Sequence, residues 1–192
     1  MRKGCAPLLI IGVILAILAA MVISSYNGFV DMEENVEQSY AQIENQLQRR
    51  LDLIPNLVNT VKGYAEHERE TIQDIADARA RLAGARTLEE QAEANEELSG
   101  ALSRLLVVVE NYPDLKANQN FTQLMDELAG TENRIAVARQ DYNGIVSAYN
   151  KKIKRFPGAL VAGIFGFDEK EYFRADSRAQ EAPTVDFEGS KQ

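Results

Sequence analysis

The sequence is poor in the residues on which metal sites, disulfide frameworks and catalytic triads depend. It contains one cysteine, Cys5, and one histidine, His67, in 192 residues. A single cysteine allows no intramolecular disulfide and no cysteine metal cluster, and a single histidine removes most histidine-dependent catalysis and zinc chemistry. Tryptophan is absent, while glycine and proline number only 12 and 5. The abundant Ala, Leu, Glu, Gln and Arg indicate a helical protein instead.

Basic charge is also in short supply. The chain has 29 acidic and 21 basic residues, which gives a net charge of −8. Because phosphate binding requires a basic footprint, this balance disfavours nucleic acid as a partner. The length suits one domain once a terminal anchor is set aside.

Residues 5–23 form an uncharged apolar run. As a helix this run would span about 28 Å, near the thickness of a hydrocarbon core, so we predict a single transmembrane anchor. Tyr26 and Phe29 fall where interfacial aromatic residues are expected. Two alternatives are a cleaved signal peptide, because residues 18–20 loosely resemble a cleavage site, and a buried core helix. No apolar lipobox precedes Cys5, which disfavours lipoprotein processing and leaves acylation as a minor alternative.

The charges that flank the apolar run predict its orientation. Arg2 and Lys3 precede it, whereas Asp31, Glu33 and Glu34 follow it. By the positive-inside rule the N-terminus is cytoplasmic and the large domain is extracytoplasmic.

An apolar stripe with helical spacing follows the run. Gaps of three and four residues match the helical period, so this segment must pack against other helices. The stripe consists of Val36, Tyr40, Ile43, Leu47, Leu51, Ile54, Val58 and Val61.

Pro55 lies inside this stripe. It removes one backbone donor and clashes with the carbonyl of the residue four positions earlier, so the helix must kink or reverse there. Because the period does not slip, we favour a kink. Arg49, Arg50, Asp52 and Asn56 surround Pro55. They are either a polar cluster organised around freed carbonyls or ordinary solvated residues.

Three further features mark the middle of the chain. His67 lacks the second histidine of an H-E-x-x-H motif and is interpreted as a surface residue. Residues 87–90 (TLEE) predict a capping box that starts a new helix. Residues 105–109 (LLVVV) are apolar on every side and are predicted to be the most buried segment, and Tyr112 with Pro113 ends this helix.

The last predicted helix carries a heptad seam. Its core positions, seven apart, are Phe121, Leu128, Ile135, Tyr142, Tyr149 and Phe156, with Leu124, Ala138 and Ile145 at a second position. Such a seam is typical of a left-handed bundle. Glu132, Arg139, Asn143 and Asn150 form a polar stripe that is either functional or ordinary surface pairing.

A basic cluster and an apolar, glycine-rich segment follow. The cluster consists of Lys151, Lys152, Lys154 and Arg155, and its simplest role is to complement the helix dipole. Residues 156–167 are too short to span a bilayer and are predicted to dock as a loop. If this end of the bundle returns to the membrane, the cluster with Phe165 and Phe167 would contact lipid. If Pro55 only kinks the first helix, we expect three segments and an end that points away.

Several blocks of the chain resemble the LemA family. They are residues 26–27, 48–58, 61–68, 78–79, 110–113, 115–118, 121, 132–133, 135, 138–139, 142–143, 149–150, 156–157 and 165–167. This resemblance implies a membrane-anchored, up-and-down bundle of four helices at the bacterial cell envelope, and it supplies no catalytic activity.

The predicted fold is therefore all-α. Residues 1–25 are the stub and transmembrane helix, residues 26–173 are an antiparallel bundle of four helical segments, and residues 174–192 are a disordered tail.

Three functions are compatible with this organisation. The first is a non-catalytic interaction or scaffold module that binds an unknown protein partner or a second copy. The alternative is a lipid-surface or envelope-remodelling factor that uses the basic and glycine-rich segment. A carboxylate metal enzyme has the least support, because no paired E-x-x-H arrangement is present. We predict no cofactor and no metal site.

Overall fold

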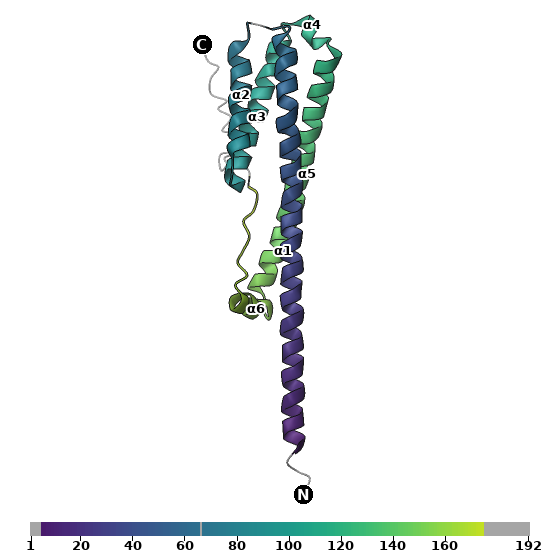
Figure 1. The fold of residues 1–192 in the computed structure, drawn as a ribbon, viewed down its shortest axis with the longest axis vertical. Coiled ribbons are helices and arrows are strands. Elements are labelled where there is room, and N and C mark those ends of the chain that lie inside the picture. The colour runs from purple at the N-terminus through teal and green to yellow at the C-terminus, as the bar shows by residue number, and fades with distance from the viewer. Residues whose placement is uncertain (1–4, 66, 175–192) are drawn as a thin grey trace, which may run out of the picture. The chain divides into compact units, whose positions relative to one another are not determined.

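The chain folds into helices in a computed structural model that describes residues 5–65 and 67–174. Within this described part no strand occurs, which confirms the all-α prediction (Figure 1). The elements are α1 (Cys5–Lys62), α2 (Arg69–Gly84), α3 (Leu88–Val109), α4 (Pro113–Lys116), α5 (Gln119–Lys154) and α6 (Gly158–Phe165). The predicted tail lies outside the described residues, apart from Arg174.

The apolar run forms the start of α1, and its described side chains are exposed. From residue 9 to residue 23 its large apolar side chains are exposed, with Leu9 at 69% and Ile23 at 61%. The most apolar window has a mean hydropathy of 2.6 and no buried residue. A core helix of a soluble protein would be buried, so the core-helix alternative is wrong. The length and composition of the apolar run are those of a membrane span.

α1 continues through Pro55 without reversing. The chain reverses instead in a short turn after Lys62, where the amide of Ala65 donates to the carbonyl of Val61 at 2.9 Å. Our expectation that a continuous helix at Pro55 would leave three bundle segments is therefore wrong. The turn that contains Gly63 supplies the missing reversal, and α1, α2, α3 and α5 make four segments.

Two compact units make up the described chain. The first contains residues 5–44 and 137–172, and the second contains residues 45–65, 67–136 and 173–174. The long helices α1 and α5 each contribute to both units.

The second unit contains an antiparallel bundle of α1, α2, α3 and α5 (Figure 1). Arg81 near the end of α2 pairs with Glu97 on α3 at 2.6 Å, whereas Asp74 near the start of α2 pairs with Arg104 at 3.0 Å. This crossed order requires that α2 and α3 run in opposite directions. Together with the short connections, it confirms the up-and-down arrangement.

The predicted seam of α5 is buried along most of its length. Phe121, Leu128, Ile135, Tyr142 and Tyr149 are each at most 4% exposed. The exception is Phe156, which is 81% exposed because α5 ends at Lys154 and the heptad no longer applies. Val146 is buried, whereas the predicted Ile145 is only half-buried.

α3 confirms one prediction and contradicts another. The Thr87 hydroxyl accepts from the amide of Glu90, and the Glu90 carboxylate accepts from the amide of Thr87, so the capping box is present. Residues 105–109 are not the most buried segment, because Leu106 is 47% and Val107 is 72% exposed. A helix on the outside of a four-helix bundle buries one face only, whatever residues its other face carries.

The first unit contains α1 up to Glu44, α5 from Val137, and α6. The glycine-rich segment forms the helix α6 rather than the predicted loop. Val161 and Ala162 are buried, and Gly166 ends the helix with a φ of 76°, a left-handed conformation that favours glycine. Of the glycines that suggested a loop, Gly158 begins the helix, Gly163 lies inside it and Gly166 ends it.

Candidate functional site

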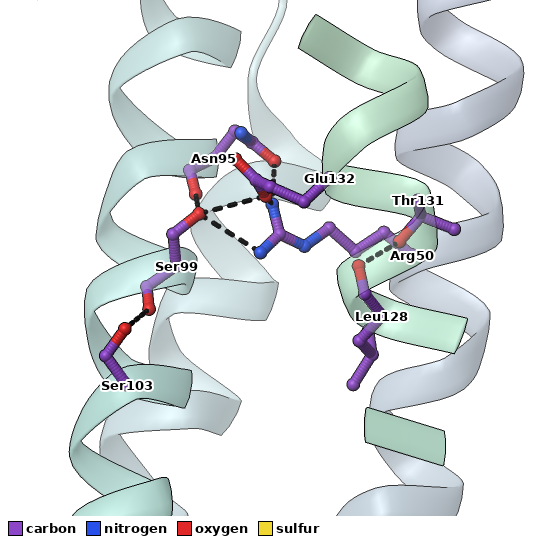
Figure 2. Close-up of polar contacts among 7 residues, drawn as sticks. All are labelled: Arg50, Asn95, Ser99, Ser103, Leu128, Thr131 and Glu132. Atoms are coloured by element: carbon purple, nitrogen blue, oxygen red, sulfur yellow. Dashed lines mark hydrogen bonds and ion pairs between the residues drawn. The ribbon is translucent and has the colours of Figure 1, made fainter. Parts of the chain in front are cut away.

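A buried arginine connects three helices of the second unit. Arg50 on α1 is 2% exposed, and its Nη1 donates to Asn95 Oδ1 on α3 at 2.6 Å. Its Nη2 donates to Ser99 Oγ at 3.1 Å, and Nη1 also forms an ion pair with Glu132 on α5. Figure 2 shows these groups converging between the helices. The sequence singled out Arg50, Glu132 and their neighbours but did not indicate that Asn95 and Ser99 would join them.

The two charged side chains of this cluster differ strongly in burial. The side chain of Arg50 is 3% exposed, whereas that of Glu132 is 43% exposed. Burial lowers the pKa of the Arg50 guanidinium, and the charge of Glu132 and its hydrogen bond oppose this shift. Because Arg50 Nε has no partner among the described residues, the guanidinium depends strongly on Glu132.

The carbonyl that Pro55 leaves without its helical donor has a partner on another helix. Arg79 on α2 donates its Nε–H to the Leu51 carbonyl at 3.0 Å. Proline removes the amide that would normally bond to this oxygen, so the guanidinium takes its place. A freed carbonyl does organise a polar contact here. Its donor is Arg79, which lies on another helix and not among the sequence neighbours of Pro55.

The other residues singled out near Pro55 have separate surroundings. Arg49 pairs with Glu127 at 3.0 Å in an exposed ion pair. Asn56 is exposed and lines an open groove of about 530 Å³ between α1 and α5. The structure therefore does not bring Asn56 into the cluster around Arg50.

Tyr112 and Pro113 lie where α3 gives way to α4. The Tyr112 hydroxyl donates to Glu68 at 2.9 Å, and this hydrogen bond raises the pKa of Tyr112. Pro113 is the first residue of α4. Their described contacts hold the turns at this end of the second unit together.

Polar residues of the stripe predicted on α5 bind different partners. Glu132 binds Arg50, whereas Asn150 holds the extended segment after α6, because its amide donates to the Lys170 carbonyl and accepts from the Lys170 amide at 2.8 and 2.9 Å. Arg139 and Asn143 are half-buried on α5. Glu132 and Asn150 therefore serve separate contacts.

Aromatic residues cluster in the first unit just beyond the apolar run. Tyr26 lies 4.9 Å from Phe165 and 5.6 Å from Phe167, measured between ring centroids. Phe29 stacks on Phe167 at 5.0 Å and contacts Tyr149 at 6.2 Å. The segment after α5 therefore returns to the part of α1 that follows the apolar run.

The basic cluster lies at the end of α5 in the same unit. Lys151 and Arg155 are exposed, and Lys154 pairs with Glu169 at 2.7 Å. Lys152 differs from them: its ammonium lies 4.5 Å from the centroid of the Phe29 ring, and burial lowers its pKa against the opposing charge of Asp31. The four residues thus have distinct environments.

Tyr149 is expected to make the stability of this unit depend on pH. Its side chain is fully buried, its hydroxyl has no hydrogen-bond partner among the described residues, and burial raises its pKa to about 12. Since the unfolded chain ionises near its ordinary value of about 10, stability is lost as pH rises from there. We expect the free energy of unfolding to fall by about 2 to 3 kcal/mol between pH 10 and 12 because of this residue.

Denaturant titrations of the full chain in detergent measure this change, and Tyr149→Phe is the matched variant. It removes an unpaired buried hydroxyl, so it is expected to be at least as stable at neutral pH and to lose less above pH 10. An identical alkaline loss in both proteins would contradict the assignment to Tyr149.

The described residues contain no group of three or more His, Cys, Asp or Glu side chains that could hold a metal ion. The acidic side chains described above serve ion pairs, hydrogen bonds and a helix cap. The described residues define a class: a helical bundle whose first helix begins with a segment that has the length and composition to anchor it in a membrane.

The comparisons with known proteins identify the family. The model of the LemA family matches residues 39–187, most of the chain, so the protein belongs to this family. Magnetosome protein MamQ 2 of Paramagnetospirillum magneticum is 29% identical, with 96% of this chain and 78% of that protein covered. Magnetosome protein MamQ of Magnetospirillum gryphiswaldense is 27% identical with the same coverage. Protein LemA of Metamycoplasma hominis is 25% identical over 71% of this chain and 63% of its own length.

Proposed function

We propose that this protein is a membrane-tethered interaction module that acts through contact with a protein partner or a second copy of itself. The observation that carries this proposal is the exposed apolar pair on α3. Leu106 and Val107 lie outside the core of the second unit, at 47% and 72% exposure. Two neighbouring apolar side chains on the outer face of α3 are accessible to a partner, and apolar side chains are a common part of protein contact sites.

Site-specific photocrosslinking in intact cells tests this proposal. A photoreactive amino acid at Val107 is expected to trap a discrete partner or a dimer. The same amino acid at Glu93, an exposed position earlier on α3, is expected to trap little. Absence of a Val107-specific product in the cells that make the protein would count against the proposal.

A second function is supported by α6: contact with the bilayer surface. Phe156, Leu160 and Ile164 are 81%, 59% and 73% exposed, and Phe165 contacts Tyr26 just beyond the membrane span. An apolar helix face at the end of a span favours shallow insertion among lipid headgroups, and the exposed Lys151 and Arg155 favour an anionic surface.

The absence of tryptophan provides a clean test of bilayer contact. Ile164→Trp introduces a single tryptophan on α6, and Val107→Trp introduces one on α3 as the matched control. In bilayers with brominated lipid we expect strong quenching at position 164 and little at position 107. If neither variant loses fluorescence when brominated lipid replaces ordinary lipid, the proposed bilayer contact is wrong.

The proposed orientation places the N-terminus in the cytoplasm and the bundle outside, because Arg2 and Lys3 precede the span. A membrane-impermeant maleimide tests it in a Cys5→Ser background with Glu96→Cys on an exposed position of α3. Labelling in intact cells is expected, and labelling only after lysis would reverse the orientation.

A further inference from the structure

A groove beside the end of the membrane span has an unusual lining. It has a volume of about 600 Å³ and lies between α1 and the end of α5 in the first unit. Ile17, Ala20 and Met21 form an apolar part within the span, and Ser24, Ser25 and Lys152 form a polar part immediately beyond it. The lining therefore changes from apolar to polar where the hydrocarbon core gives way to the headgroup region.

Lys152 supplies a positive charge without an ion-pair partner. Among the described residues, no carboxylate lies within ion-pair distance of its ammonium, although the charge of Asp31 acts on it from farther away. The ammonium lies over the Phe29 ring instead, at 4.5 Å from its centroid. The Ser24 and Ser25 hydroxyls likewise have no hydrogen-bond partner in the described part of the chain.

Gly28 allows the Lys152 ammonium to lie close to α1. A Cβ atom at residue 28 would lie 2.5 Å from Lys152 Nζ, so any other residue would push the ammonium away. The position of the charge in the groove thus depends on a residue of α1 that has no side chain.

We propose that this groove binds one anionic phospholipid, whose phosphate contacts the Lys152 ammonium and the hydroxyls of Ser24 and Ser25. One acyl chain of this lipid lies along Ile17, Ala20 and Met21. The occupant is a lipid rather than a free anion because the apolar part continues the surface that α1 already presents to the membrane. Three donors at headgroup depth match the charge and hydrogen-bonding capacity of a phosphate. The inference rests on the proposed bilayer contact and names a specific ligand site within it.

Binding to the delipidated full-length protein in neutral detergent tests the site. Native mass spectrometry would count the lipid retained during titration with phosphatidylglycerol or phosphatidylcholine. We expect one phosphatidylglycerol per chain and preference over phosphatidylcholine. Lys152→Gln is expected to weaken this binding by about tenfold, the effect of losing one charge-assisted hydrogen bond.

Two variants distinguish a built site from general attraction. Lys151→Gln makes the same charge change at the adjacent, exposed residue, and we expect less than about a twofold effect because solvent screens it. Gly28→Ala keeps every charge but displaces the ammonium, so it is expected to weaken binding as well. Equal losses in Lys151→Gln and Lys152→Gln would overturn the proposal, as would displacement of the lipid by millimolar inorganic phosphate.

The quenching of Ile164→Trp remains an independent readout of bilayer contact. If that quenching is strong while Lys152→Gln binds lipid normally, the specific site is wrong and the surface contact stands. If position 164 is not quenched, the bilayer contact itself fails.

Discussion

Glu132→Gln is expected to destabilise the protein by about 3 kcal/mol, although the side chain of Glu132 is nearly half exposed. The loss arises at its partner. The Arg50 guanidinium is 3% exposed, and without the carboxylate it becomes a buried charge held by two neutral acceptors, Asn95 and Ser99. A buried charge that loses its counter-charge is costly because water cannot reach it. Denaturant unfolding of the full chain in detergent measures the effect.

Replacing the arginine of this pair is expected to cost less stability than replacing the glutamate. Arg50→Met removes the buried charge, and the remaining Glu132 is exposed enough to be hydrated. The main cost of Arg50→Met is that Asn95, which is 3% exposed, loses its hydrogen-bond partner. We expect this loss to lower the stability by about 1 to 2 kcal/mol. The double variant Arg50→Met/Glu132→Gln should therefore be more stable than Glu132→Gln alone.

An exposed pair on the same two helices supplies the control. Arg49 and Glu127 lie 3.0 Å apart, with side chains 56% and 37% exposed. Because solvent screens this pair, Arg49→Met and Glu127→Gln should each cost less than about 1 kcal/mol. Additive losses in the Arg50 and Glu132 double-mutant cycle would show that the two groups do not depend on each other.

The sequence is most informative where a pattern is long and repeated. The heptad seam of α5 is buried from Phe121 to Tyr149, because a residue every seventh position stays on one helix face. The capping box at Thr87 is equally local, since its two hydrogen bonds join residues three apart. Such features depend on neighbours in sequence and can be predicted without the fold.

The contacts that the sequence did not indicate join partners that are distant in sequence. The contact of Arg79 with the Leu51 carbonyl joins residues 28 positions apart, and that of Arg50 with Asn95 joins residues 45 apart. No local spacing encodes these pairs, because they exist only once the turn after Lys62 brings α2 and α3 back along α1. The glycines of α6 suggested a loop for a related reason. Gly158 lies close to Phe29 on α1 and to the Lys152 carbonyl on α5, and this packing stabilises a helix that the composition of the segment does not favour.

Two arginines in the apolar run are expected to abolish membrane association. Leu15 and Leu18 lie in the middle of the run, at 60% and 53% exposure, so their side chains would face the hydrocarbon core. Each arginine at such a depth costs about 3 kcal/mol in insertion, and two together cost about 6 kcal/mol, enough to exclude the helix from the membrane. We expect Leu15→Arg/Leu18→Arg to move from the carbonate-resistant membrane pellet to the supernatant.

The matched control places the same charges on the same helix beyond the span. Gln42 and Asn45 are exposed and have the same spacing of three residues, so Gln42→Arg/Asn45→Arg should remain in the pellet. The mass of the mature protein decides between an anchor and a signal peptide. An anchored chain keeps residues 1–25 and stays in the pellet, whereas a chain shortened near Ala20 and recovered in the supernatant would show that the apolar run is removed. In that case neither α6 nor Lys152 would have a span beside it, and every lipid contact proposed above would fail with it.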